Sequence, residues 1–273
     1  DFLLILAMLL PFFALFGFIT VYGFGVIYAE LKVSSFIQDK TGPMGQGYGF
    51  HAGKWGFLQP VADGLHLFFK EDIIPATADR PLFILAPFLI FIGMFVGIIA
   101  IPFGEAIIIS DMNIGIFYIL GVGSLAVIAL ILAGWSSNNK WALYGGMRSA
   151  AQIISYEIPA GLSLIVVILL ASSLSMQEII SYQSGGMFNW IIFDNPFMPI
   201  AFIIFFISAL AETNRTPFDL PESESELVAG FVTEYSGARY AFFFLSEYVN
   251  MFVISAVAST AFLGGWQSPF PNF

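Results

Sequence analysis

The sequence predicts an all-α integral membrane protein, and two observations predict it. First, 58% of the 273 residues are hydrophobic and only 10% are charged, whereas soluble domains carry about 45–50% apolar and about 25% charged residues. Second, long apolar runs recur along the chain, and a helix needs roughly 20 such residues to cross about 30 Å of hydrocarbon. This composition excludes an ordinary soluble enzyme and a disordered chain.

Six apolar segments are long enough, or nearly so, to cross a membrane. They cover about residues 2–28, 82–103, 113–135, 150–171, 190–211 and 240–266. The fifth is the weakest, since Asp194 and Asn195 lie near its start. The first has no basic residue before it and no small-residue cleavage pattern after it, so we interpret it as a span rather than a signal peptide. We expect one polytopic membrane domain over residues 1–273.

The nine basic residues predict the orientation of these segments, because they all lie in alternate connections. The connection over residues 29–81 holds five, and those over 136–149 and 212–239 hold two each. Basic residues stay on the cytoplasmic side of a membrane. We therefore expect these three loops inside and both termini of the sequence on the outer side.

The first inner connection also contains a helix of a different kind. Apolar residues recur at helical spacing from Leu58 to Phe69, with Asp63 and His66 on other faces. This pattern predicts an amphipathic helix suited to the plane of the lipid headgroups. Packing against a partner subunit would explain the pattern equally well.

Three glutamates lie within or at the end of apolar segments, where an ionised side chain is energetically unfavourable. Glu157 and Glu247 lie inside the fourth and sixth segments, and Glu212 closes the fifth. An ionised carboxylate inside hydrocarbon costs at least ~2.5 kcal/mol on insertion scales. Few basic residues are nearby to pair with them, so the pattern favours proton handling. A structural hydrogen bond to a neighbouring helix is the simpler alternative for any one of them, and Glu105 is the acid to which it applies best.

The connection after residue 211 is the most acidic part of the chain. Its acids are Asp219, Glu222, Glu224, Glu226 and Glu234. Arg215 is the only base there before Arg239, and interleaved apolar residues such as Phe218 and Leu220 indicate an ordered, partly buried loop. Crowded carboxylates titrate together and can take up or release protons.

The composition also limits the cofactors. With no Cys, the chain cannot hold an iron–sulfur cluster by thiolates. Neither His51 nor His66 lies inside a span, so a pair of histidines cannot clamp a haem there. The net charge of −10 argues against binding nucleic acid. The residues alone thus predict a proton-handling membrane subunit that binds no cofactor of its own.

Several motifs together resemble one family. Residues 212–230 read ETNRTPFDLPESESELVAG and residues 234–237 read EYSG; residues 58–64, 70–75, 134–140 and 151–158 read LQPVADG, KEDIIP, GWSSNNK and AQIISYEI. In this order they resemble the H-type membrane subunit of respiratory complex I, the bacterial counterpart of mitochondrial NADH dehydrogenase subunit 1.

The resemblance implies a subunit of a proton-pumping NADH:quinone oxidoreductase in the bacterial plasma (inner) membrane. It implies ubiquinone or menaquinone as substrate, and FMN and iron–sulfur clusters carried by partner subunits, with the terminal cluster in the peripheral arm. Glu157, Glu212 and Glu247 then form a proton pathway towards other membrane-arm subunits. Arg215 and the acids of the loop from Asp219 to Glu234 then form a quinone-chamber and coupling loop.

The family's quinone entrance lies between the first span, the sixth span and the amphipathic helix. This assigns Glu30, Lys32, Asp63 and His66 to the entrance. The sequence is less basic here than the family, because Leu31 replaces an Arg and His66 replaces a Lys. Family members have eight spans, so we interpret the six-span sequence as a fragment.

Other functions remain open on the residues. The homologous membrane subunit of an energy-converting, membrane-bound hydrogenase has a similar bundle but serves proton reduction. A stand-alone carboxylate-based ion transporter would also carry buried acids, and a purely structural anchor would carry them for hydrogen bonding alone.

Overall fold

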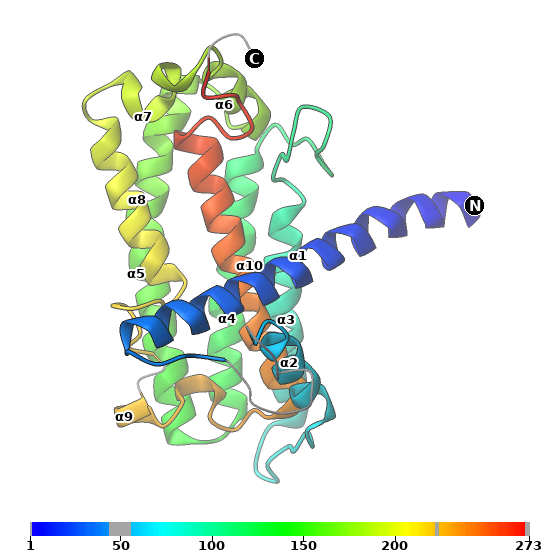
Figure 1. The fold of residues 1–273 in the computed structure, drawn as a ribbon. Coiled ribbons are helices and arrows are strands. Elements are labelled where there is room, and N and C mark those ends of the chain that lie inside the picture. The colour runs from blue at the N-terminus through cyan, green and yellow to red at the C-terminus, as the bar shows by residue number, and fades with distance from the viewer. Residues whose placement is uncertain (1, 44–55, 222–223, 271–273) are drawn as a thin grey trace. The chain divides into compact units, whose positions relative to one another are not determined.

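The computed structural model describes residues 2–43, 56–221 and 224–270, without the side chains of 2–12, 224 and 225. In these residues the regular structure is helical throughout, from α1 to α10, and contains no strand (Figure 1). The described chain forms two compact units, and the single polytopic membrane domain that the sequence predicts stays a prediction. The first is Asp1–Ile73 with Ser236–Val249, and the second is Ile74–Tyr235 with Asn250–Phe273.

The first unit consists of α1 (Phe2–Ile37), α2 (Gln59–Phe69) and the first part of α10 (Gly237–Phe262). α1 continues well past the expected end of the first span at residue 28. The reason is local, because Ala29 to Lys32 are good helix formers and no Gly or Pro follows before Gly42. α2 is the amphipathic helix that the sequence predicts, and it lies against α1.

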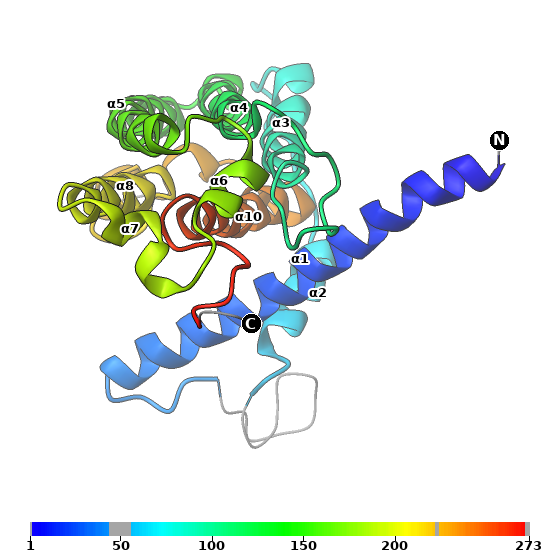
Figure 2. The same ribbon diagram turned by 90° about the horizontal axis from the view of Figure 1, so that it is seen from above.

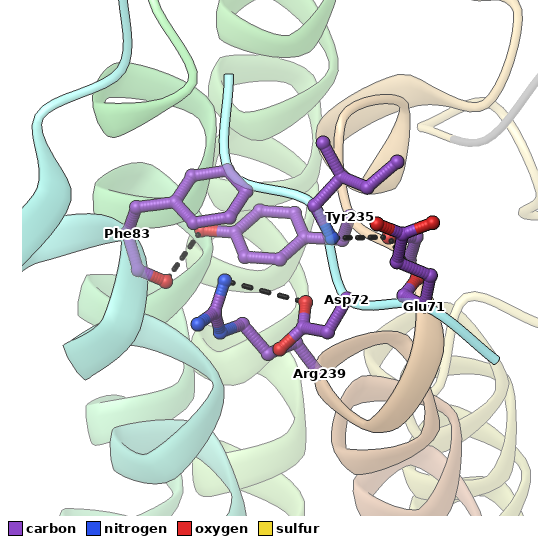
Figure 3. A network of polar contacts seen from close by, with 7 residues as sticks. Glu71, Asp72, Phe83, Tyr235 and Arg239 are labelled. Carbon is purple, nitrogen blue, oxygen red and sulfur yellow. Dashed lines mark hydrogen bonds and ion pairs between the residues drawn. The ribbon is translucent and has the colours of Figure 1, made fainter. Parts of the chain in front are cut away.

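A short segment after α2 is tied to the start of α10 within the first unit (Figure 3). The Ser236 hydroxyl accepts a hydrogen bond from the Ile73 N–H at 3.2 Å and donates one to the Glu71 carbonyl at 3.3 Å. One turn later, Arg239 forms an ion pair with Asp72 at 3.3 Å. These contacts join two segments of the first unit that are more than 160 residues apart in the sequence.

The second unit is a helical bundle. α3 (Arg80–Ile98), α4 (Gly115–Ser136), α5 (Lys140–Ala171) and α8 (Met198–Glu212) pack side by side in that order. The second part of α10 lies among them (Figure 2). Large side chains that are almost fully buried form its core: Phe83, Ile98, Ile116, Leu164 and Phe262.

Five helices in the described part of the chain are long and apolar enough to cross a membrane, namely α1, α3, α4, α5 and α10. The expected span over residues 190–211 differs. The chain there forms α7 (Ile191–Asp194), a break, and α8, whose 15 residues extend only about 22 Å. The break follows from Pro196, because the residue before a proline avoids the helical region, and Asn195 is extended. Whether residues 190–211 cross the membrane, as the sequence predicts, stays a prediction.

The expected inner connection over residues 136–149 is mostly helical, and its position on the inner side of the membrane stays a prediction. α5 begins at Lys140, directly after Asn139. The Asn139 side chain accepts a hydrogen bond from the Trp141 N–H at 2.9 Å and so caps the helix. Only three residues, 137–139, connect α4 to α5.

Two other helices end before the expected limits of their spans. α3 ends at Ile98 rather than near residue 103, and Pro102 prevents the helix from continuing. α10 ends at Phe262 rather than near residue 266, and it is followed by Gly264 and Gly265 with φ of 77° and 57°.

One buried amide organises the end of the second unit near α6 (Met176–Tyr182). Gln183 is fully buried. Its amide nitrogen donates to the carbonyls of Ile179 and Thr260, and its oxygen accepts from the N–H groups of Ile191 and Gly264. Three separate segments are therefore joined through one side chain.

α5 approaches the loop that follows α8 very closely at Gly145. A Cβ at this position would lie 2.5 Å from the Cα of Gly230 and 2.6 Å from the backbone nitrogen of Phe231. Backbone atoms cannot move aside as a flexible side chain can, so the contact requires glycine.

We expect Gly145→Ala to destabilise the second unit by about 1–3 kcal/mol, the usual range for overpacking. The measurement is thermal unfolding of the purified protein in detergent. Gly161→Ala in the same helix is the matched control, because nothing lies within 4 Å of its added Cβ. Equal melting temperatures for the two variants would contradict the prediction.

Candidate functional site

A cavity in the second unit brings a carboxylate into the bundle. Its volume is about 40 Å³, and α3, α4, α5, α8 and α10 all contribute to its wall. Most of the lining is apolar, with Glu212 and Asn250 as the polar residues. Gly93 and Gly97 of α3 and Gly123 of α4 also line it, and their missing side chains leave the space open.

The Glu212 carboxylate lies against α4 inside this cavity. A Cβ at Gly123 would lie 3.8 Å from Glu212 Oε1. Glu212 is the last residue of α8, so its backbone joins the bundle to the acidic loop. The sequence prediction of a carboxylate at this helix end therefore corresponds to a group that faces the bundle interior.

Glu157 of α5 lies close enough to Glu212 for their charges to interact. Its Oε1 accepts a hydrogen bond from the Ser124 hydroxyl of α4 at 2.9 Å. The same hydroxyl lies 3.2 Å from the Leu120 carbonyl. Ser124 is a site residue that sequence reasoning missed, because a serine in an apolar helix gives no signal of its own.

Glu247 is placed differently from the other two predicted pathway acids. It is half-buried in the part of α10 that belongs to the first unit, whereas Glu157 and Glu212 belong to the second. The structure thus brings two of the three acids together within one unit.

The loop after α8 is held by Gln152 of α5. The Gln152 amide nitrogen lies 2.8 Å from the carbonyls of Ala211 and Phe218 and 3.2 Å from Asn214 Oδ1. The Phe218 ring also packs edge-on against Tyr156, one turn further along α5. Gln152 fixes the first turn after Glu212, and the sequence contains no hint of this role.

Two further contacts attach the acidic loop to the start of α5. Arg148 forms an ion pair with Glu226 at 2.6 Å, and both side chains are substantially exposed, at 41% and 54%. The Asn139 amide donates to Glu234 Oε1 at 2.5 Å. α9 (Glu224–Leu227) and the loop around it therefore lie along the part of α5 that the sequence predicts as a loop.

Tyr235 closes the loop within the second unit. Its ring stacks on Phe83 of α3 at 4.0 Å with an interplanar angle of 3°. Its hydroxyl donates to the Phe83 carbonyl at 3.3 Å (Figure 3). The same hydroxyl lies 3.3 Å from the Ser136 hydroxyl.

The predicted loop residues thus have different surroundings. Asp219 and Glu226 are exposed, while Arg215 and Glu234 are half-buried. Glu222 and the side chain of Glu224 lie outside the described residues. Glu226 and Glu234 each have a partner on or beside the start of α5.

The predicted entrance residues all lie in the first unit. Glu30 Oε2 accepts a hydrogen bond from the Tyr248 hydroxyl at 2.8 Å. Lys32 donates to the carbonyls of Thr41 and Pro43, at 3.3 Å each.

The other two entrance residues lie on α2. Asp63 accepts from Gln59 on the same helix at 2.7 Å, and His66 is exposed. Gly64 lies between them in sequence, where a Cβ would be 3.6 Å from the Phe24 ring of α1. Asp63 and His66 thus lie on α2, which contacts α1.

Comparison with known proteins identifies the family. The family model for NADH dehydrogenase matches residues 9–273. The chain is 53% identical over 248 residues to the H-type subunit of NADH-quinone oxidoreductase from Chlorobaculum tepidum, and the match covers 90% of this chain and 67% of that protein. The corresponding protein of Chlorobium luteolum is 50% identical over 272 residues, with 99% and 70% covered. That of Geobacillus sp. strain WCH70 is 51% identical over 255 residues, with 93% and 72% covered.

These similarities extend over nearly the whole chain, which spans about two thirds of the length of the first two relatives. They confirm the resemblance found in the sequence motifs, and the long apolar helices agree with it. The chain therefore belongs to the NADH dehydrogenase family, as an integral membrane protein and an H-type subunit of NADH-quinone oxidoreductase.

Proposed function

We propose that this subunit helps to form the quinone-binding chamber and couples quinone reduction to proton translocation through its buried glutamates. The observation that carries the proposal is the pair Glu157 and Glu212, whose charges interact beside a cavity in an apolar bundle. Ionisable groups inside membrane bundles are expensive and commonly serve proton relays.

Glu157 lies close enough to Glu212 for its charge to act on Glu212, because like charges repel each other. The Ser124 hydroxyl gives Glu157 one hydrogen-bond partner, while the cavity gives Glu212 room for water. A change of charge at Glu157 therefore acts on Glu212.

The acidic loop provides the link from quinone chemistry to this pair. Its first turn follows Glu212 directly and is fixed by Gln152, and its acids Asp219 and Glu226 face outward. We propose that the chamber and coupling loop is formed by Arg215, Asp219, Glu222, Glu224, Glu226 and Glu234. The electrostatic effect of a change of charge on quinone would then act on Glu212 through the acids of this loop, which is anchored on α5.

We further propose that quinone enters beside the first unit, near Glu30, Lys32, Asp63 and His66. Three apolar residues of α2 are exposed, namely Leu65, Phe68 and Phe69, and Phe69 most of all at 86%. A helix with such a face suits the lipid headgroup boundary, from which a lipid-soluble quinone enters.

The remaining parts of the proposal concern partners and orientation. We propose that partner subunits carry FMN and the iron–sulfur clusters, with a peripheral-arm subunit holding the terminal cluster, and that other membrane-arm subunits receive the protons. In the described residues no group of three or more His, Asp or Glu could hold a metal ion. We also propose a bacterial inner-membrane location, as in the family, and the distribution of basic residues supports an orientation with both ends of the sequence outside.

Copurification tests the partners. Affinity purification of the tagged subunit from membranes in mild detergent should yield subunits that contain FMN and iron–sulfur clusters, detected by flavin fluorescence and electron paramagnetic resonance. A chain that purifies alone and transports ions in liposomes would favour the stand-alone transporter instead. A nickel-containing partner would favour the hydrogenase subunit.

Glu212→Gln and Glu247→Gln test the coupling acids. Glutamine keeps the side-chain shape and cannot release a proton, so we expect quinone-dependent proton pumping to be lost in inverted membrane vesicles. Reduction of an artificial acceptor at the flavin site should continue. Glu105→Gln is the control, because Glu105 is exposed on another connection and should not alter pumping. Unchanged pumping in Glu212→Gln would contradict the proposal.

Gln152→Leu tests the anchor of the loop. The change leaves the carbonyls of Ala211 and Phe218 without this donor, which costs about 1–3 kcal/mol for each buried group. We expect the KM for quinone to rise and the number of protons pumped per electron to fall, while artificial-acceptor reduction stays normal. Ser155→Ala in the same helix should be silent, because its hydroxyl bonds within α5 to the Ala151 carbonyl. A Gln152→Leu variant with unchanged quinone kinetics would remove the loop anchor from the mechanism.

A further inference from the structure

Asn250 stands out among the residues of the second unit that the coupling proposal does not use. Its side chain belongs to the second part of α10 and lines the same cavity as Glu212. The residue is only 8% exposed. No hydrogen bond from its side chain to another described residue is found, and its amide atoms are not among the fully buried polar atoms without a partner, so the amide keeps some accessible surface at the cavity.

Taking an amide away from water is costly when no hydrogen bond replaces those to water. Asparagine has two N–H donors and a carbonyl acceptor. An amide that lines a cavity and keeps accessible surface there is satisfied by a ligand that can both accept and donate hydrogen bonds. Water is the ligand of that chemistry.

The size of the cavity fits this ligand. One water needs about 10–15 Å³ of such volume, so about 40 Å³ accommodates about three molecules. The polar groups of the wall come from different helices, with Glu212 at the end of α8 and Asn250 on α10. A buried water needs two to four polar partners, and these two side chains together with neighbouring waters provide them.

The apolar part of the wall supports the same interpretation. Ile116, Leu164, Val253 and Val257 are nearly fully buried and offer no hydrogen bond from their side chains. Without Asn250, waters beside Glu212 would have the carboxylate as their main side-chain partner in the cavity. The Asn250 amide thus determines whether a small hydrogen-bonded cluster of water is stable in the cavity.

We propose that Asn250 is a positioning residue that anchors a small cluster of water against the Glu212 carboxylate, so that Glu212 can gain and lose its proton during coupling. The inference rests on the proposed function of Glu212 and adds a residue to it. Asn250 does not itself carry the proton, because its amide does not ionise. It holds the water that does.

Asn250→Leu in the assembled complex tests the proposal. Leucine has the same branched shape and no hydrogen-bonding group. We expect the pumping rate to fall about 2- to 10-fold, which corresponds to losing one hydrogen bond of about 0.5–1.5 kcal/mol. Asn250→Ser keeps a hydroxyl for water and should pump within about twofold of the unaltered protein. Val257→Ala, which changes an apolar residue of the same cavity on the same helix, should also stay within about twofold.

Infrared spectroscopy gives a readout that a purely structural role would not change. At acidic pH the carbonyl stretch of the protonated Glu212 side chain is identified as the band missing in Glu212→Gln. This band should move to higher wavenumber in Asn250→Leu, since the carbonyl loses hydrogen bonding to water, and stay in place in Val257→Ala. Artificial-acceptor reduction verifies that each complex has assembled.

The outcomes separate the two proposals. Normal pumping in Asn250→Leu with an unmoved band would overturn the role of Asn250, while lost pumping in Glu212→Gln would still support coupling. An equal loss in Asn250→Ser and Asn250→Leu would also overturn it, because the hydroxyl should retain the water. Normal pumping in Glu212→Gln would overturn the proposed function itself.

Discussion

A carboxylate inside a bundle of apolar helices needs a hydrogen bond, water or a proton, and the second unit is built around this requirement. Glu157 accepts a hydrogen bond from the Ser124 hydroxyl. Glu212 faces a cavity that is lined in part by three glycines of α3 and α4. Larger side chains at those glycines would fill the space that the carboxylate needs. The apolar packing of α3, α4, α5 and α8 is thus interrupted beside Glu212.

The first turns of α5 form a platform for the acidic loop. Asn139 caps the helix and also donates to Glu234, Gly145 permits backbone contact with Gly230, and Gln152 holds the turn after Glu212. An exposed ion pair such as that of Arg148 contributes at most about 1 kcal/mol. The buried backbone contacts therefore determine the course of the loop, and the surface charges adjust it.

Composition and apolar runs were sufficient to predict a helical membrane protein, because the cost of burying polar backbone in lipid leaves few alternatives. Helix limits were predicted less well. Asn139 caps α5 and so extends it, and Pro196 divides the expected fifth span. Both effects come from single residues, and the sequence alone does not show how strongly one residue acts within a long apolar run. Glu157 and Glu212 could be predicted because a charge in an apolar run is conspicuous in any sequence.

Their partners could not be predicted from the chain alone. Gln152 meets Phe218 across 66 positions and Arg148 meets Glu226 across 78, and such pairs are set by how helices pack. The crowding of acids in the loop was visible in the sequence, but the basic partner of Glu226 lies on a different helix. Asn250 is a neutral polar residue within a long helix, and its position at the cavity could be seen only in the fold.

Gln183 has a consequence for the movement of protons. Its amide nitrogen and its oxygen each make two hydrogen bonds, which uses every bonding position that the side chain has. A proton hopping along water needs a free donor and a free acceptor at each step, and a saturated amide provides neither. Gln183 therefore has no bonding position left for a water chain and serves as a structural link at the α6 end of the bundle.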